Sequence, residues 1–246
     1  MNFTNNYYQF VTTTLEKTYQ NNYDAILKGA QILYDCEVNG GKIYTFGTGH
    51  SHMIGQELYG RACGYAKIYP IMEIEMTLAT HPTKSTTLER CASYADVLDV
   101  LYTIEANDVI IATSNSGRNP LVIEYVSRCK AKGAKIIAIT SLKHSSEVTS
   151  RHESGLRLFE LADVILDNHA PLGDGGVAID ETCTMGPIST ITGCFLAQSL
   201  VGCFVELLKQ NNIDAPVFVS SNIDKGDAYN KDLFNNYVIK KTKNGV

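Results

Sequence analysis

Residues 108–120 read DVIIATSNSGRNP, an apolar run of β-forming residues that passes directly into a loop of Ser, Asn and Gly. Such runs are typical of strands buried in a parallel sheet. Pro120 suits the first turn of a helix expected over 119–132, and Gly133 stands just beyond its end. The stretch predicts a strand, a polar turn and a helix, in that order.

The same pattern extends outward in both directions. Further short apolar runs are 42-KIYTF-46, 66-AKIYPIM-72, 135-KIIAIT-140 and 163-DVILD-167. Helices are expected between them over 51–62, 86–104 and 144–150. This alternation predicts an α/β fold with a doubly wound parallel sheet of five strands, whose ligands bind outside the carboxyl ends of the strands.

The flanks of this core are expected to be helical. Apolar residues recur at helical spacing over 3–37, interrupted by the Asn-rich stretch 20–22, which predicts one or two helices. A long apolar stretch at 187–208 predicts a buried helix, and residues 211–230 look irregular. Without a repeat or linker, residues 1–246 are expected to form a single domain: a helical segment (1–40), an α/β core (41–210) and a C-terminal extension (211–246).

Composition narrows the class of protein. Hydrophobic residues make up 44% and charged residues 19% of the chain, as in ordinary globular proteins. A net charge of −5 without a Lys/Arg cluster argues against a nucleic-acid partner. The first residues lack a basic start and an apolar core, and we expect a cytoplasmic protein with no membrane partner.

The chain has seven cysteines, and no pair shows C-x-x-C spacing. We expect reduced, mostly buried thiols.

The loop 47-GTGHS-51 follows the first predicted strand. Gly47 and Gly49 let the backbone approach a ligand, and Ser51 would offer a hydroxyl and nearby N–H groups at a helix start, which favours an anion. A dinucleotide or P-loop site is not indicated, because His52 holds the third glycine position and no G-K-[ST] follows. The alternative for this loop alone is a turn with an N-cap.

The second loop offers a similar set of groups. Ser114, Asn115, Ser116, Gly117 and Asn119 lie at the start of a predicted helix, where hydroxyls and the Gly117 amide can bind phosphate without Lys or Arg. A turn with an N-cap is again the alternative. Because both loops follow strand ends, together they predict one anion site.

The two loops resemble the G-x-G-x-S and S-x-S-G loops of the sugar isomerase (SIS) domain family, which jointly bind a phosphosugar. The resemblance covers roughly residues 30 to 210 and is closest to uncharacterised bacterial SIS proteins. These are kin to N-acetylmuramic acid 6-phosphate etherase and phosphoheptose isomerase. The resemblance implies a flavodoxin-like sheet, no cofactor, and a homodimer or larger homo-oligomer with shared active sites.

Two glutamates are candidate bases. Glu57 in 56-QELYGR-61 resembles the E-L-x-G-R segment of phosphoheptose isomerases that contains a catalytic glutamate; its alternative is an ion pair with Arg61. Glu181 in 180-DETCTMGP-187 resembles the E-x-x-x-G-P segment of glucosamine-6-phosphate synthase isomerase domains, with a one-residue insertion. Its alternative is a solvated acidic pair with Asp180.

The remaining candidates are polar residues beside the predicted site. His50 flanks Ser51 and is a candidate for assisting ring opening; with His52 it lacks a clear third ligand, so no metal is expected. Asn168 is expected to meet sugar hydroxyls or to form an Asx-turn. Ser189 completes the phosphate site or caps the last helix.

These observations lead to one hypothesis with rivals. The first is an aldose–ketose isomerase of a hexose- or hexosamine-6-phosphate with Glu57 or Glu181 as base. The rivals are a non-catalytic phosphosugar sensor and an etherase-like lyase acting on a sugar 6-phosphate.

Overall fold

The computed structural model describes residues 2–239, so the end of the expected C-terminal extension, 240–246, lies outside the described residues. Its centre is a sheet of five parallel strands in the order β2-β1-β3-β4-β5. The strands are β1 (Ile43–Gly47), β2 (Ile68–Ile71), β3 (Val109–Thr113), β4 (Lys135–Thr140) and β5 (Val164–Asp167). The predicted flavodoxin-like sheet is confirmed. In its register Gly47 pairs with Thr113, so the loops after β1 and β3 leave the sheet side by side.

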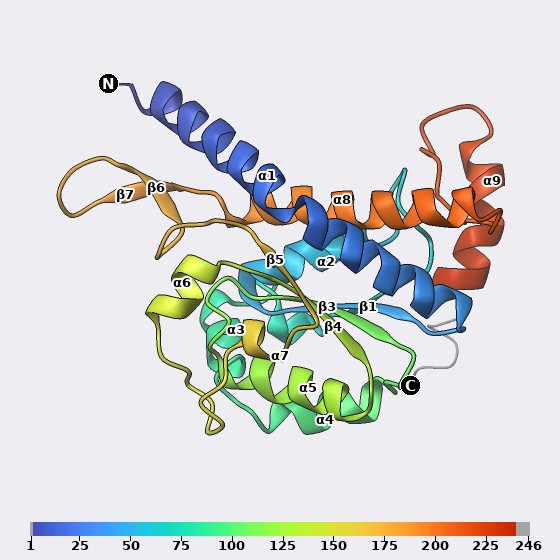
Figure 1. The fold of residues 1–246 in the computed structure, drawn as a ribbon, viewed down its shortest axis with the longest axis horizontal. Coiled ribbons are helices and arrows are strands. Elements are labelled where there is room, and N and C mark those ends of the chain that lie inside the picture. The colour runs from blue at the N-terminus through green and yellow to red at the C-terminus, as the bar shows by residue number, and fades with distance from the viewer. Residues whose placement is uncertain (1, 240–246) are drawn as a thin grey trace.

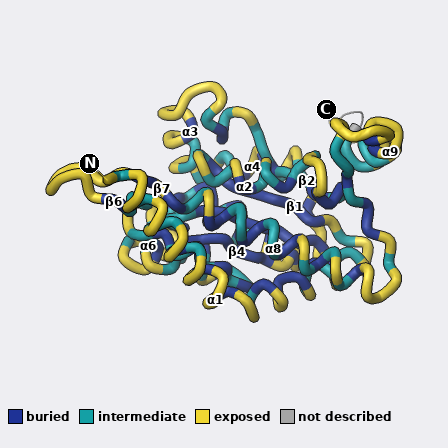
Figure 2. The backbone as a smooth tube through the Cα atoms, turned by 90° about the horizontal axis from the view of Figure 1, so that it is seen from above, coloured by how far each residue is buried: buried dark blue, intermediate teal, exposed yellow. Residues whose placement is uncertain are grey.

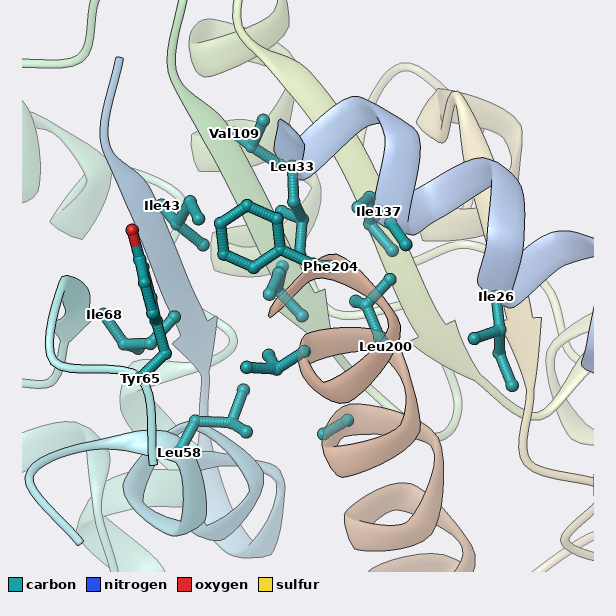
Figure 3. Close-up of a cluster of buried hydrophobic side chains, with 14 of the residues drawn as sticks. Ile26, Leu33, Ile43, Leu58, Tyr65, Ile68, Val109, Ile137, Leu200 and Phe204 are labelled. Atoms are coloured by element: carbon teal, nitrogen blue, oxygen red, sulfur yellow. The ribbon is translucent and has the colours of Figure 1, made fainter. Parts of the chain in front are cut away.

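Helices cover both faces of the sheet (Figure 1). One face carries α1 (Phe3–Val38), α2 (His52–Leu58) and α8 (Ser189–Gln210), and the other carries α4 (Tyr94–Leu101), α5 (Pro120–Ala131) and α7 (Leu158–Leu161). Alternate strand residues enter the two cores, as a period of two requires: Ile137 packs in the first and Ile136 in the second. Figure 3 shows the first core, where Phe204 and Leu200 of α8 meet the sheet.

Helix α1 runs unbroken for 36 residues, through the Asn-rich stretch expected to interrupt it. The reason is Asn22, which is buried and pairs with the backbone of Asp167 at the end of β5: its Nδ2 donates to Asp167 O (2.9 Å), and its Oδ1 accepts from Asp167 N (2.7 Å). Asn22 therefore joins the helix to the sheet.

Helix α8 is long and apolar enough by composition to cross a membrane. In the fold a stripe at helical spacing, including Leu196, Leu200 and Phe204, is buried against α1 and the sheet. This packing is that of a core helix.

Two segments differ from expectation, and a third, after β5, has secondary structure where none was predicted. The helix expected over 86–104 is two helices, α3 (Pro82–Leu88) and α4, separated by a turn. The segment after β5 includes an antiparallel hairpin of β6 (Gly175–Ala178) and β7 (Thr184–Pro187), which projects beside α1 and is largely exposed (Figures 1 and 2). Part of the stretch expected to be irregular begins α9 (Gly226–Leu233), followed by the π-helical segment η3 (Phe234–Ile239).

The seven cysteines are all free, but only two are buried, contrary to expectation. Cys36 and Cys129 lie in the cores, whereas Cys63, Cys91 and Cys183 are exposed.

Candidate functional site

A cavity of about 600 Å³ opens at the carboxyl ends of the strands. This size falls within the usual range of small-molecule sites. Its walls come from the loops after β1, β3 and β5, from α3, from α6 (Leu142–Glu147) and from the start of α8. The cavity thus lies where a doubly wound sheet binds its ligands.

Most of the residues singled out from the sequence line this cavity. They are Gly49, His50, Ser51, Ser114, Asn115, Ser116, Asn119, Asn168 and Ser189. Gly47 and Gly117 are not among the lining residues and instead shape the turns. A Cβ on Gly47 would lie 2.7 Å from Ser51 O, and Gly117 has a φ of +57° with a Cβ position 2.9 Å from Ser145 Oγ. Both loops need glycine at these points.

The cavity hydroxyls divide into engaged and unengaged groups. Ser114 Oγ accepts from Gly117 N (3.2 Å), and Ser189 Oγ donates to Asp174 Oδ2 (2.6 Å). Within residues 2–239, the hydroxyls of Ser51 and Ser116 make no hydrogen bond to protein, and neither do the N–H groups of Asn115 and Ser116. These unengaged donors come from both loops.

Asp174 occupies the N-terminal end of α8. Its Oδ1 accepts from Ser189 N (2.8 Å) and Ile188 N (3.1 Å). A carboxylate in this position is stabilised by the helix dipole and takes the place that a ligand anion would otherwise occupy. An anion in the cavity is therefore favoured on the side of the β1 and β3 loops.

Glu89, just after α3, brings a carboxylate into the cavity that the sequence analysis did not single out. Its Oε2 accepts a hydrogen bond from Thr48 Oγ1 (3.0 Å). Burial raises the pKa of Glu89, and the Thr48 hydroxyl and the charges of Arg90 and Arg151 offset only part of this rise. A carboxyl group with a raised pKa in a cavity is suited to accepting and returning a proton.

His144 on α6 is a second titratable group that lines the cavity and was not singled out. Its Nδ1 is buried and, among the described residues, has no hydrogen-bond partner. Burial lowers the pKa of His144, which favours the neutral ring. The ring is then able to donate or accept a proton at a ligand oxygen.

The two glutamates proposed as bases do not reach the cavity. Glu57 at the end of α2 contacts Arg61 and accepts from Gln198 Nε2 (3.0 Å) on α8, so the alternative ion pair is present. Glu181 is exposed in the turn between β6 and β7, and the neighbouring Asp180 accepts from Thr182 N (2.8 Å). Within a single chain, both side chains are outside the site.

Metal ligation has no cluster to support it in residues 2–239, where no group of three His, Cys, Asp or Glu side chains converges. His50 is an exposed cavity residue, and His52 Nδ1 contacts Gly49 O.

A family model described as SIS domain matches residues 6–141, which include both cavity loops. The chain belongs to the SIS domain family. The resemblance inferred from 47-GTGHS-51 and 113-TSNSG-117 is thereby confirmed.

This SIS protein has relatives along nearly its whole length. A UPF0309 protein of Halalkalibacterium halodurans is 45% identical, covering 94% of this chain and 96% of its own. A UPF0309 protein of Oceanobacillus iheyensis is 36% identical, covering 96% and 97%.

Solved structures share the fold at low identity. The phosphoheptose isomerase of Neisseria gonorrhoeae has a TM-score of 0.52 at 16% identity, covering 81% of this SIS chain and 95% of its own. The NanR protein of Vibrio vulnificus, complexed with ManNAc-6P, has a TM-score of 0.53 at 16% identity, covering 86% and 66%.

Proposed function

We propose that the chain is a phosphosugar isomerase of the aldose–ketose type, acting on a hexose- or hexosamine-6-phosphate. One observation carries the proposal: Glu89, whose pKa is raised by burial, lines the same cavity as the unengaged hydroxyls of Ser51 and Ser116. A phosphate anchor and a proton-transfer group within one cavity are what such an isomerisation needs.

The phosphate binds between the loops after β1 and β3. Ser51 and Ser116 donate their hydroxyls, and the N–H groups of Asn115 and Ser116 add backbone donors. No Lys or Arg lines the described cavity, so the phosphate is held by neutral donors. Asp174 disfavours a second phosphate position at the start of α8.

Glu89 moves the proton between the two carbons. Its carboxylate removes the proton from C2 of the open-chain aldose, giving an enediol, and returns it to C1 to form the ketose. His144 or His50 exchanges a proton with the sugar oxygens during these steps. Asn168 and Ser189 contact sugar hydroxyls and hold the reacting carbons near Glu89.

Glu57 or Glu181 could act in the same proton transfer only if a second copy of the chain brought it to the cavity, because both lie outside the cavity of their own chain. Glu181 lies on the projecting hairpin, and the hairpin of one subunit in a homodimer with shared sites would carry it toward the cavity of the other. Glu57 is held by Arg61 and Gln198, which makes it the weaker candidate.

The structural neighbours support the ligand class. One is the phosphoheptose isomerase described above, and the NanR protein was solved with the sugar phosphate ManNAc-6P. We extend to this chain only the binding of a sugar phosphate. The experiment below determines which sugar is bound, its stereochemistry and the direction of the reaction.

The proposal is tested by proton NMR in D2O with a panel of hexose and hexosamine 6-phosphates. We expect exchange of the C2 proton and formation of the ketose, both lost in Glu89→Gln and retained in the matched variant Glu57→Gln. Loss in Glu57→Gln or Glu181→Gln with an active Glu89→Gln would move the base to that residue.

Two results would replace the isomerase with a rival. Binding without exchange, weakened by Ser116→Ala, indicates a phosphosugar sensor. Release of lactate from N-acetylmuramic acid 6-phosphate indicates a lyase.

A further inference from the structure

The arginines of this chain fall into two groups. All six lie in the described residues, and three of them, Arg61, Arg128 and Arg157, form ion pairs with carboxylates. The other three, Arg90, Arg118 and Arg151, have no carboxylate partner within residues 2–239. None of these three lines the cavity, but each is next to a residue that does: Arg118 and Arg151 are beside Asn119, and Arg90 is beside Glu89.

Backbone and side-chain contacts hold Arg118 and Arg151 together beside Asn119, which lines the cavity. Arg151 N donates to Arg118 O (2.9 Å), and Arg151 Nη1 donates to Oδ1 of the cavity residue Asn119 (3.0 Å). Arg118 follows directly on Gly117 of the second loop, and its Nη2 donates to Thr149 Oγ1 (3.3 Å). Arg90 adjoins Glu89, whose carbonyl accepts from Leu121 N on α5.

This grouping is electrostatically unfavourable without an anion. Partial burial and the charge of Arg151 both lower the pKa of Arg118, so the two guanidinium groups are close enough to repel each other. The Nε of Arg118 is buried and has no hydrogen-bond partner among the described residues. A buried donor of this kind carries an unfavourable free energy that a bound acceptor would remove.

We infer that the ligand of this cavity carries a second anionic group, in addition to its phosphate, which Arg118 and Arg151 bind beside Asn119. The inference rests on the proposed function and deepens it. The phosphate needs only the neutral donors of the β1 and β3 loops, whereas the planar guanidinium forks suit a carboxylate or a second phosphate. The substrate class becomes a doubly anionic sugar phosphate.

Two relationships to cavity residues agree with this assignment. Asn119 orients Arg151 and also lines the cavity, so Arg151 contacts a residue of the cavity wall. Arg90 and Arg151 both lower the pKa of Glu89, which places their charges within electrostatic reach of the cavity carboxylate. A second anion on the ligand would therefore lie near Asn119, the cavity residue that contacts Arg151.

The test compares ligands with one and two anionic groups by isothermal titration calorimetry on the full-length protein. Glucose 6-phosphate and N-acetylglucosamine 6-phosphate carry one. 6-Phosphogluconate and N-acetylmuramic acid 6-phosphate add a carboxylate, and fructose 1,6-bisphosphate adds a phosphate. We expect at least one doubly anionic ligand to bind ten-fold more tightly or better, and the added group it carries identifies the second anion.

The variants are Arg151→Gln and Arg118→Gln, with Lys143→Gln as the matched control. Arg151 is exposed, so its substitution leaves the fold intact even where Arg118→Gln disturbs the loop. Lys143 is an exposed cation of α6 without an ion pair among the described residues, and its loss removes the same charge from a side chain that makes no contact with Arg118 or Arg151 there. In the arginine variants, we expect the ratio of the affinities for doubly and singly anionic ligands to fall at least five-fold. Their affinity for the singly anionic ligands should stay unchanged.

Two outcomes overturn the inference. The first is that the wild-type protein binds singly and doubly anionic ligands with equal affinity. The second is that both arginine variants still prefer the doubly anionic ligands. Failure of every sugar phosphate to bind overturns the proposed function as well. Tight binding of the singly anionic ligands without preference overturns the second-anion inference alone.

Discussion

Thr48 Oγ1 donates a hydrogen bond of 3.0 Å to Glu89 Oε2, and so the loop after β1 fixes the carboxylate that enters the cavity. The bond also favours the ionised form of Glu89 and lowers a pKa that burial raises. The position and the basicity of the Glu89 carboxylate therefore depend on the loop after β1, which also contains Ser51, a proposed ligand of the phosphate.

Thr48→Val should raise the pKa of Glu89 further, because it removes the hydrogen bond while preserving the shape of the side chain. In the proposed isomerase, the acidic limb of the pH–rate profile for C2 proton exchange would move to higher pH. Thr87→Val, which changes a hydroxyl of α3 that bonds only within its own helix, should leave the profile unchanged. An unshifted profile in Thr48→Val would show that the bond does not tune the base.

Glu89→Gln should stabilise the fold at neutral and alkaline pH. A carboxyl group with a folded pKa above its unfolded value of about 4.3 contributes stability that is fully present below that value and lost as pH rises through the folded pKa. Thermal unfolding should therefore show a higher Tm than wild type at pH 8 and a similar Tm at pH 4. A lower Tm at pH 8 would contradict the assigned direction.

Asn22→Ala should destabilise the protein by about 2–3 kcal/mol, because it leaves the partly buried N–H and C=O of Asp167 without partners. Urea unfolding at constant m-value measures the loss. Gln20→Ala, at an exposed position two residues earlier on α1, should change stability by less than about 0.5 kcal/mol. Equal effects of the two variants would refute the role given to Asn22.

Gly117→Ala and Gly202→Ala should have opposite effects on stability. Gly117 has a φ of +57° and a Cβ position 2.9 Å from Ser145 Oγ, so alanine should destabilise by about 1–2 kcal/mol or more and weaken binding of sugar phosphates. Gly202 lies inside α8 with nothing within 4 Å of its Cβ position, and alanine should stabilise by about 0.5–1 kcal/mol. Chemical denaturation of both variants checks the signs.

The sheet was predictable because its strands are short apolar runs. Runs such as 108-DVIIAT-113 start within two residues of the strands found, since burial on both faces leaves a continuous apolar signature. The continuity of α1 was not predictable in this way. Local preference disfavours Asn within a helix, and the contact that overrides it comes from Asp167, 145 residues away.

The residues of the candidate site also fall into those that local sequence predicts and those that it does not. Residues of the two loops lie next to strand ends and could be expected at one edge of the sheet, whereas Glu89 enters the cavity because a turn separates α3 from α4. No periodicity marks that turn. The single-domain boundaries and the catalytic roles of Glu57, Glu181 and His50 stay predictions for the experiments above.

Helix α1 is synthesised long before α8, which covers part of its apolar stripe. Ile26, Ala30 and Leu33 pack in a core that includes Leu200 and Phe204 of α8, which begins at residue 189. At typical synthesis rates of 5–20 residues per second, α8 follows roughly 8–30 s after α1 is complete, and the part of the stripe that packs on α8 stays uncovered for that time. The nascent chain thus presents a long amphipathic helix to chaperones, and truncation before α8 should yield an aggregating product.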